Sequence, residues 1–180
     1  MIQRIQSFWL VLAACCMALC FMFPAAQYRL EMPATGQQAE ARLDLLAQNN
    51  PEMLDQIQNI APVVVYSQQA SGFTTWPLAV LAALTGVIAI VALFMYRNRV
   101  RQMRVVAVAF LLNMVYVFLL FFWAVDSYGK VFRQALEGSD MTVSWFVGAY
   151  APLVSLVLLV LAHRGIKKDE AKVRAADRLR

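Results

Sequence analysis

The chain has 180 residues, of which 61% are hydrophobic and 15% are charged, and its formal net charge at pH 7 is +5. This composition excludes an ordinary soluble domain and indicates a membrane protein. No basic-aromatic motif or nucleic-acid-binding signature accompanies the positive charge, so we expect no nucleic-acid partner.

The first predicted segment, residues 1–23, is a short N-terminal turn followed by a helix whose uncharged run is Ser7–Phe23. Two alternatives are a secretory signal cleaved near FPAAQ and a lipoprotein-like acylation site at the sequence LAAC, residues 12–15. We favour an uncleaved membrane helix, because the apolar run is longer than a signal core and continues as CMALCFMF after the first cysteine.

All three cysteines, Cys15, Cys16 and Cys20, lie in this run. They therefore do not form the disulfide framework of an exported domain. We interpret them as small packing residues, because no His, Asp or Glu accompanies them in the run, and we expect no metal site there.

A long polar connection, residues 24–75, has room for a small cap containing both helix and strand. Within it AQYRLEM alternates as a strand does, and QQAEARLDLLAQNN has helical periodicity at Ala39, Leu43 and Leu46. PEMLDQIQNI predicts a second short helix with Pro51 in its first turn, and PVVVYSQ predicts a returning strand.

Residues 76–125 are predicted to form a helical hairpin, with apolar runs at Trp76–Tyr96 and Val105–Val125. The intervening stretch RNRVRQMR, residues 97–104, is short enough to join only antiparallel neighbours. Ala82 and Gly86 are four residues apart, a spacing that lets helix backbones approach closely. Ala14 with Ala18, and Ser144 with Gly148, share this spacing.

A second connection, residues 126–142, is predicted to add one or two helical turns. The last apolar helix is predicted at residues 143–162, from Val143 to Ala162, with Pro152 producing a kink or local opening. Residues 163–180 then form a charged tail. Aromatic residues near the predicted helix ends are typical of membrane interfaces, and they are Trp76, Tyr96, Trp123, Tyr128 and Trp145.

The distribution of Lys and Arg predicts the topology. Twelve of the 16 fall before the first helix, between the second and third, or after the fourth, and four fall in the other two connections. Because cytoplasmic connections carry the excess of basic residues, we predict four transmembrane helices with both termini cytoplasmic. The basic side also predicts contact with the bilayer and its anionic headgroups.

Asn113 is the most polar residue inside the apolar runs, near the middle of the third helix. We interpret it as an interhelical hydrogen-bonding residue, which would contribute about 0.6 kcal/mol and at most about 2 kcal/mol. The alternative is a binding groove near Asn113 and Pro152, as in a small transporter or lipid-binding protein.

No charged residue lies inside the four runs, and no phosphate loop, nucleophile elbow, HExxH or CxxC pair occurs in the chain. His163, the single histidine, follows the last run and is interpreted as a solvated interfacial residue. We therefore expect no enzymatic activity and no cofactor, with a membrane-bound enzyme as a third alternative after docking and the binding groove.

The tail is predicted to continue the fourth helix, because Ile166, Val173, Ala176 and Leu179 form a broken apolar stripe. The opening MIQRIQ, the stretch YRNR and the ending IKKDEAKVRAADRLR resemble those of a bacterial inner-membrane family, domain of unknown function 4293. The resemblance implies an all-α membrane protein with four transmembrane helices, located in the bacterial inner membrane. It implies no particular reaction.

The two charged ends lead to a functional hypothesis: a scaffold or accessory subunit that docks a membrane or cytoplasmic protein partner through its cytoplasmic face. We predict that the N-terminal turn packs on the tail helix, with Arg4 paired to one of the tail acids. The residues predicted to form this docking surface are Ile2, Arg4, Ile5, Asp169, Glu170, Val173, Asp177 and Leu179.

Overall fold

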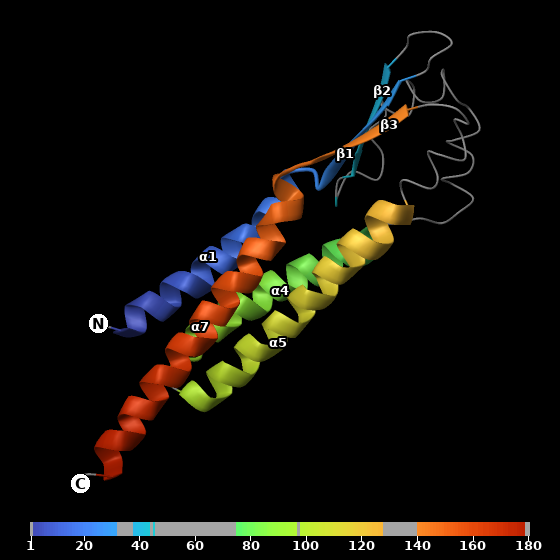
Figure 1. Ribbon diagram of the computed structural model, residues 1–180. Helices are drawn as coiled ribbons and strands as arrows, with labels where there is room; N and C mark the ends of the chain where they lie inside the picture. Colours follow the sequence, from blue (N-terminus) through green and yellow to red (C-terminus); the bar gives the residue numbers. More distant parts are fainter. Residues whose placement is uncertain are drawn as a thin grey trace. The chain divides into compact units, whose positions relative to one another are not determined.

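The computed structural model describes residues 2–31, 38–43, 45, 75–96, 98–127 and 140–178 (Figure 1). In chain order its elements are α1 (Ile2–Met22), β1 (Ala26–Glu31), β2 (Gln38–Leu43), α4 (Trp76–Phe94), α5 (Arg99–Phe118), the π-helix η1 (Leu119–Ala124), β3 (Asp140–Trp145) and α7 (Val147–Arg178). The chain divides into two compact units. The first comprises Met1–Leu19, Val80–Val117 and Ala151–Arg180, and the second Cys20–Ala79 and Phe118–Tyr150.

Three helical segments are long and apolar enough to cross a membrane: Trp76–Phe94, Arg99–Ser127 and Val147–Val173. Gln6–Met22 is a shorter apolar helix. The protein is therefore mostly helical and has the composition and helix lengths of the membrane class.

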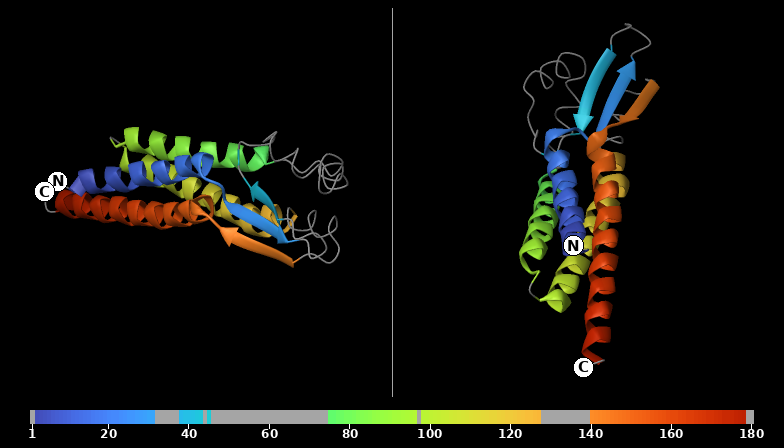
Figure 2. Two further views of the ribbon diagram at one scale, coloured as in Figure 1. Left: turned by 90° about the horizontal axis from the view of Figure 1, so that it is seen from above. Right: turned by 90° about the vertical axis from the view of Figure 1, so that its left-hand side faces the viewer.

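Parts of α1, α4, α5 and α7 run side by side in the first unit (Figures 1 and 2). Two hydrogen bonds attach α7 to its neighbours. The Ser155 hydroxyl donates to the carbonyl oxygen of Ala13 on α1 over 3.3 Å, and the Asn113 amide of α5 donates to the carbonyl oxygen of Pro152 over 3.3 Å. Both donors are fully buried, so these bonds satisfy polar groups in the bundle interior.

Two further contacts involve α4. The Gln102 amide of α5 donates to the carbonyl oxygen of Ala92 over 3.0 Å. A Cβ at Gly86 would lie 3.7 Å from the Cβ of Met17 on α1. The four helices are thus linked in the cyclic order α1, α4, α5, α7, in which helix α1 is also a neighbour of α7.

Small side chains fill the inward face of α4, and larger apolar ones point outward. Ala82, Thr85, Ala89 and Ala92 are buried, as the close approach of helices requires. The outward face carries exposed Val80, Leu84, Val87, Ile90 and Val91. The Ala14 and Ala18 spacing does not mark such an inward face, because Ala18 is exposed.

The connection between α4 and α5 is shorter than predicted. It occupies residues 95–98, and the arginines Arg99, Arg101 and Arg104 already belong to α5. Asn98 explains the early start, because its side-chain oxygen accepts a hydrogen bond from the Arg101 backbone N–H over 3.4 Å, the pattern of an N-cap.

The second unit contains a three-stranded antiparallel sheet in the order β2-β1-β3 (Figure 2). Its central strand, β1, coincides with the predicted strand AQYRLEM. The register pairs Ala26 with Leu43 on β2 and with Trp145 on β3. The described part of the sheet therefore joins the two polar connections predicted at residues 24–75 and 126–142.

The helix predicted over QQAEARLDLLAQNN is wrong for Gln38–Leu43, which forms strand β2. Ala39 and Leu43 are four residues apart, and such residues lie on the same face both in a helix and in a strand. A short segment therefore does not distinguish the helical period of 3.6 residues from the strand period of 2. Pairing with β1 satisfies the backbone and favours the strand. The predicted helix PEMLDQIQNI and strand PVVVYSQ lie outside the described residues.

The predicted start of the last helix at Val143 is also wrong, because Asp140–Trp145 is strand β3 and α7 begins at Val147. The β-branched Thr142 and Val143 favour this conformation. Ser144 and Gly148 consequently do not share a helix face, since Ser144 lies in the strand. The turns predicted in residues 128–139 lie outside the described residues.

Candidate functional site

Helix α7 continues without interruption beyond its apolar part. It has 32 residues, Val147–Arg178, and at about 1.5 Å per residue its length is about 48 Å. A bilayer core of about 30 Å would leave several turns outside it. The charged segment that follows Ala162 is therefore the end of α7, as far as Arg178.

The beginning of α1 packs on this part of α7. The Gln6 side-chain amide donates a hydrogen bond to the Asp169 carboxylate, and both side chains are buried. Gly165, one turn earlier on α7, leaves the space for Gln6, since a Cβ there would lie 3.0 Å from Gln6 Cγ. Asp169 is thus turned toward α1 and away from solvent.

The predicted docking residues are only partly placed by the structure. Asp169 contacts the start of α1, although through Gln6 and not through a described bond to Arg4. Val173 is 41% exposed, and Glu170 is partly exposed. The side chains of Ile2, Arg4, Ile5 and Asp177, and the whole of Leu179, lie outside the described residues.

Sequence reasoning missed Gln6. The signal that could have found it is its position as the last side chain with a carboxamide or a charge before the apolar run. On α7, Arg164 is the first charged residue after the corresponding run. The apolar runs of α1 and α7 therefore give way to polar residues at the same end of these two adjacent helices.

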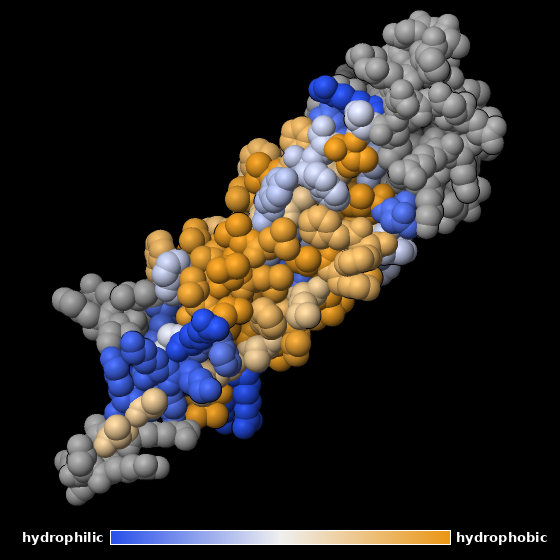
Figure 3. Space-filling view, viewed as in Figure 1, coloured by the Kyte–Doolittle hydropathy of each residue, from blue (hydrophilic) through white to orange (hydrophobic). Residues whose placement is uncertain are grey.

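Exposed basic side chains surround this end of the first unit. We call them the basic end: Arg101 and Arg104 on α5, and Arg164, Lys167, Lys168 and Lys172 on α7, all exposed. Figure 3 shows hydrophilic residues gathered here, next to a continuous hydrophobic surface over the helices. Of the acids on this part of α7, Asp169 is buried and Glu170 is partly exposed.

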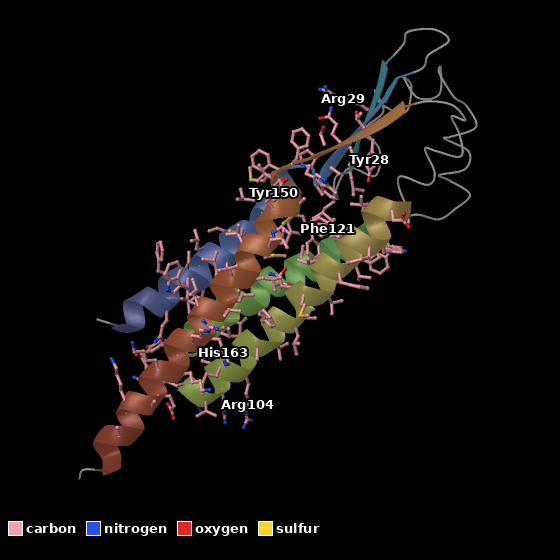
Figure 4. The ribbon with its side chains drawn as sticks, in the orientation of Figure 1. Tyr28, Arg29, Arg104, Phe121, Tyr150 and His163 are labelled. Atoms are coloured by element: carbon pink, nitrogen blue, oxygen red, sulfur yellow. The ribbon has the colours of Figure 1, made fainter. Side chains whose placement is uncertain are left out.

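His163 directly precedes Arg164 of the basic end on α7, and Figure 4 labels it together with Arg104 on α5. The histidine is partly buried, and its Nδ1 atom is enclosed with no hydrogen-bond partner among the described residues. Within those same residues, no group of three or more His, Cys, Asp or Glu side chains could hold a metal ion. This end therefore presents positive charge to a ligand, without a metal-ligand cluster in its described part.

Asn113 and Pro152, the residues of the alternative binding groove, contact each other directly. Asn113 is fully buried, and its side-chain nitrogen donates to the Pro152 carbonyl oxygen. The Asn113 side-chain oxygen is enclosed with no partner in the described part of the chain. The pair forms an interhelical contact and leaves one buried acceptor unused.

In the second unit, contacts of Tyr28 and Trp145 connect the sheet to the π-helix and the residue that follows it. Figure 4 labels Tyr28 and Phe121, which lie on β1 and on the π-helix. The Tyr28 hydroxyl donates to the carbonyl oxygen of Val125 over 3.1 Å. The rings of Phe121 and Trp145 lie 5.2 Å apart, centroid to centroid. Tyr28 is fully buried, so it acts as an anchor whose role the sequence did not reveal.

These features define a predominantly helical protein with three candidate membrane-spanning helices, a small antiparallel sheet and a basic end. The sequence matches the family described as Domain of unknown function (DUF4293) over residues 2–179, and the chain belongs to this family. A search of curated proteins found no match.

Proposed function

We propose that the protein is a multi-pass component of a bacterial inner membrane, with four transmembrane helices and both termini in the cytoplasm. Helix α1 supplies the proposed fourth span, because its apolar part, Gln6–Met22, is about 26 Å long, at the short end of the range of spanning helices. The orientation rests on the basic residues, of which twelve of 16 flank the proposed cytoplasmic side.

Within this placement, the protein acts as a non-enzymatic scaffold or accessory subunit that docks a protein partner on its cytoplasmic face. The observation that carries the proposal is the buried hydrogen bond from Gln6 to Asp169. It attaches the start of α1 to the extended end of α7, so the two ends contribute to one surface. Val173, one turn beyond Asp169, is exposed on this extension and provides an apolar contact.

The test is purification from native membranes without crosslinking, followed by identification of co-eluting proteins. We expect one stoichiometric partner. Removal of residues 170–180 should preserve membrane insertion and abolish recovery of that partner, and Ile5→Asp should weaken recovery comparably. Arg29→Gln, an exposed change on β1, is the control and should have no effect. Full partner recovery and full in-cell activity in both cytoplasmic variants would refute the docking role.

The side-chain oxygen of Asn113, which has no hydrogen-bond partner among the described residues, favours a second candidate function, a small transporter or lipid-binding protein with a site near Asn113 and Pro152. A buried acceptor without a donor is costly in a bundle interior, and a bound molecule with a donor group would relieve this cost. Co-purification of a stoichiometric lipid or small molecule that is lost in Asn113→Leu would support this candidate over docking.

A further inference from the structure

The part of α7 that follows its apolar run has two unlike faces. Ala162, Ile166 and Asp169 are buried and follow one another at intervals of four and three residues, so they share the face that packs on the bundle. Side chains two residues further along lie about 200° around the helix, on the opposite face. The exposed side chains of that opposite face are all basic or small, and we call them the basic face of α7: Arg164, Lys167, Lys168, Ala171, Lys172 and Ala175.

The acids of this segment do not lie within the basic face. Asp169 is buried and bonded to Gln6 on α1. Glu170 is partly exposed, and it lies about 100° around the helix from Ala171, at the border of the basic face. Four positive charges therefore lie on one side of a single helix, with one acid at their edge.

The basic face extends further along α7 than lipid headgroups reach. Lys172 is ten residues beyond Ala162, about 15 Å along the helix, whereas the headgroup layer on each side of a bilayer core is about 5–8 Å thick. Figures 1 and 2 show α7 continuing past the turn between α4 and α5. Bases of a nucleic acid would find no stacking partner here, since residues 164–180 contain no aromatic side chain.

We propose that the basic face of α7 binds an acidic helix of a protein partner. The partner's carboxylates pair with the basic side chains, which gives the two surfaces complementary charge. Ala171 and Ala175 are four residues apart in the middle of the face, between Lys167 and Lys172. Their short side chains let a second helix approach closely, because the distance between packed helices depends on the side chains at the contact. The inference rests on the docking function proposed above and names the chemistry of the partner.

The experiment uses the full-length chain in phosphatidylcholine nanodiscs and a labelled synthetic helical peptide with Glu and Ala on one face and Gln on the other. Binding is followed by fluorescence anisotropy, and we expect this peptide to bind more tightly than an isomer whose Glu residues are spread around the helix. An exposed ion pair contributes a factor of up to about five in binding, so Lys168→Gln with Lys172→Gln should weaken binding by up to about 25-fold. Ala171→Gln with Ala175→Gln keeps every charge and should weaken binding to a similar extent, because the longer side chains hold the peptide away.

Lys168→Arg with Lys172→Arg is the matched control, which keeps both charges and should retain binding. Circular dichroism identifies any variant that fails to fold. The proposal would be overturned by absence of peptide binding to the wild-type chain or by unchanged affinity in the Lys168→Gln, Lys172→Gln variant. Lysine-dependent binding of phosphatidylglycerol vesicles without peptide binding would assign the face to lipid and overturn it as well.

Recovery of the native partner separates this inference from the docking function. A partner recovered from native membranes equally with the wild-type chain and with the Lys168→Gln, Lys172→Gln variant would overturn the inference and leave docking in place. Failure to recover any partner with the wild-type chain would instead refute the docking function itself.

Discussion

The side-chain amide of Gln6 on α1 donates a hydrogen bond to the carboxylate of Asp169 on α7, across 163 positions of the sequence. Both side chains are buried. An ionised carboxylate removed from water needs hydrogen-bond donors, and Gln6 supplies one without adding a second charge. The bond therefore fixes the start of the first helix against the end of the last one.

Removal of this donor should destabilise the protein. Gln6→Ala leaves the Asp169 carboxylate buried without its hydrogen-bond donor. We expect this to lower the free energy of unfolding by about 1–3 kcal/mol, the cost of a buried polar group without a partner. Asp169→Asn, which keeps a buried acceptor and removes the charge, should be less costly. The measurement is reversible unfolding in detergent, followed by circular dichroism.

A double-mutant cycle isolates this bond. Gln6→Leu combined with Asp169→Leu removes both polar groups, so the double variant should be more stable than the sum of the two single effects predicts. Strict additivity of the single effects would contradict the coupling of these two residues.

Two glycines should respond in opposite ways to the same substitution. A Cβ at Gly148 would lie 2.5 Å from the carbonyl oxygen of Phe23 and 2.6 Å from that of Pro24, and backbone atoms cannot move aside easily. Gly148→Ala should therefore lower the free energy of unfolding by about 1–3 kcal/mol. Gly86→Ala is the matched control, because the nearest atom to its Cβ would be 3.7 Å away.

At Gly86 the added methyl group fits, and alanine has the higher helix propensity by about 1 kcal/mol. We expect Gly86→Ala to be neutral or slightly stabilising in the same unfolding measurement. Equal destabilisation by both substitutions would show that the close approach at Gly148 has no particular importance.

The apolar helices could be predicted from the sequence because each run is long enough that only one conformation satisfies its backbone in a membrane. The strands could not all be predicted, because the periodicity of β2 also fits a helix, and β3 depends on pairing with β1, which is distant in sequence. The spacing of Ala39 and Leu43 fits both a helix and a strand. Val143 lies next to the apolar run of the last helix, so the sequence does not separate it from that helix. In both cases the hydrogen bonds to β1 decide the conformation.

The candidate site was predictable in part for a related reason. The charge pattern reveals which end of each helix is basic, so the approach of the N-terminal turn to the tail was a reasonable prediction. It does not reveal which side chain turns inward. Asp169 is buried because Gly165 leaves room for Gln6 beside it, and this depends on the rotation of two packed helices.

Asn113→Leu should leave the protein inserted and folded. It removes one interhelical hydrogen bond to Pro152, and such bonds contribute about 0.6 kcal/mol and at most about 2 kcal/mol in membranes. Replacement of the unpartnered Asn113 oxygen by a methyl group offsets part of this loss. We therefore expect a loss of no more than about 1–2 kcal/mol by unfolding in detergent. Complete loss of a cellular phenotype at unchanged abundance and stability would favour the binding-groove function instead.

Reporter fusions test the proposed topology at three positions. Fusions after Arg101 and after Arg180 should be active only with a reporter that works in the cytoplasm, because these positions lie in the two most basic segments. A fusion after Asn50 should be active only with a reporter that works outside the cytoplasm, since residues 24–75 carry two basic residues and five acids. As a control, Arg101→Gln with Arg104→Gln leaves the tail charges in place and should not invert the map. Cytoplasmic activity of the fusion after Asn50 would refute the proposed topology.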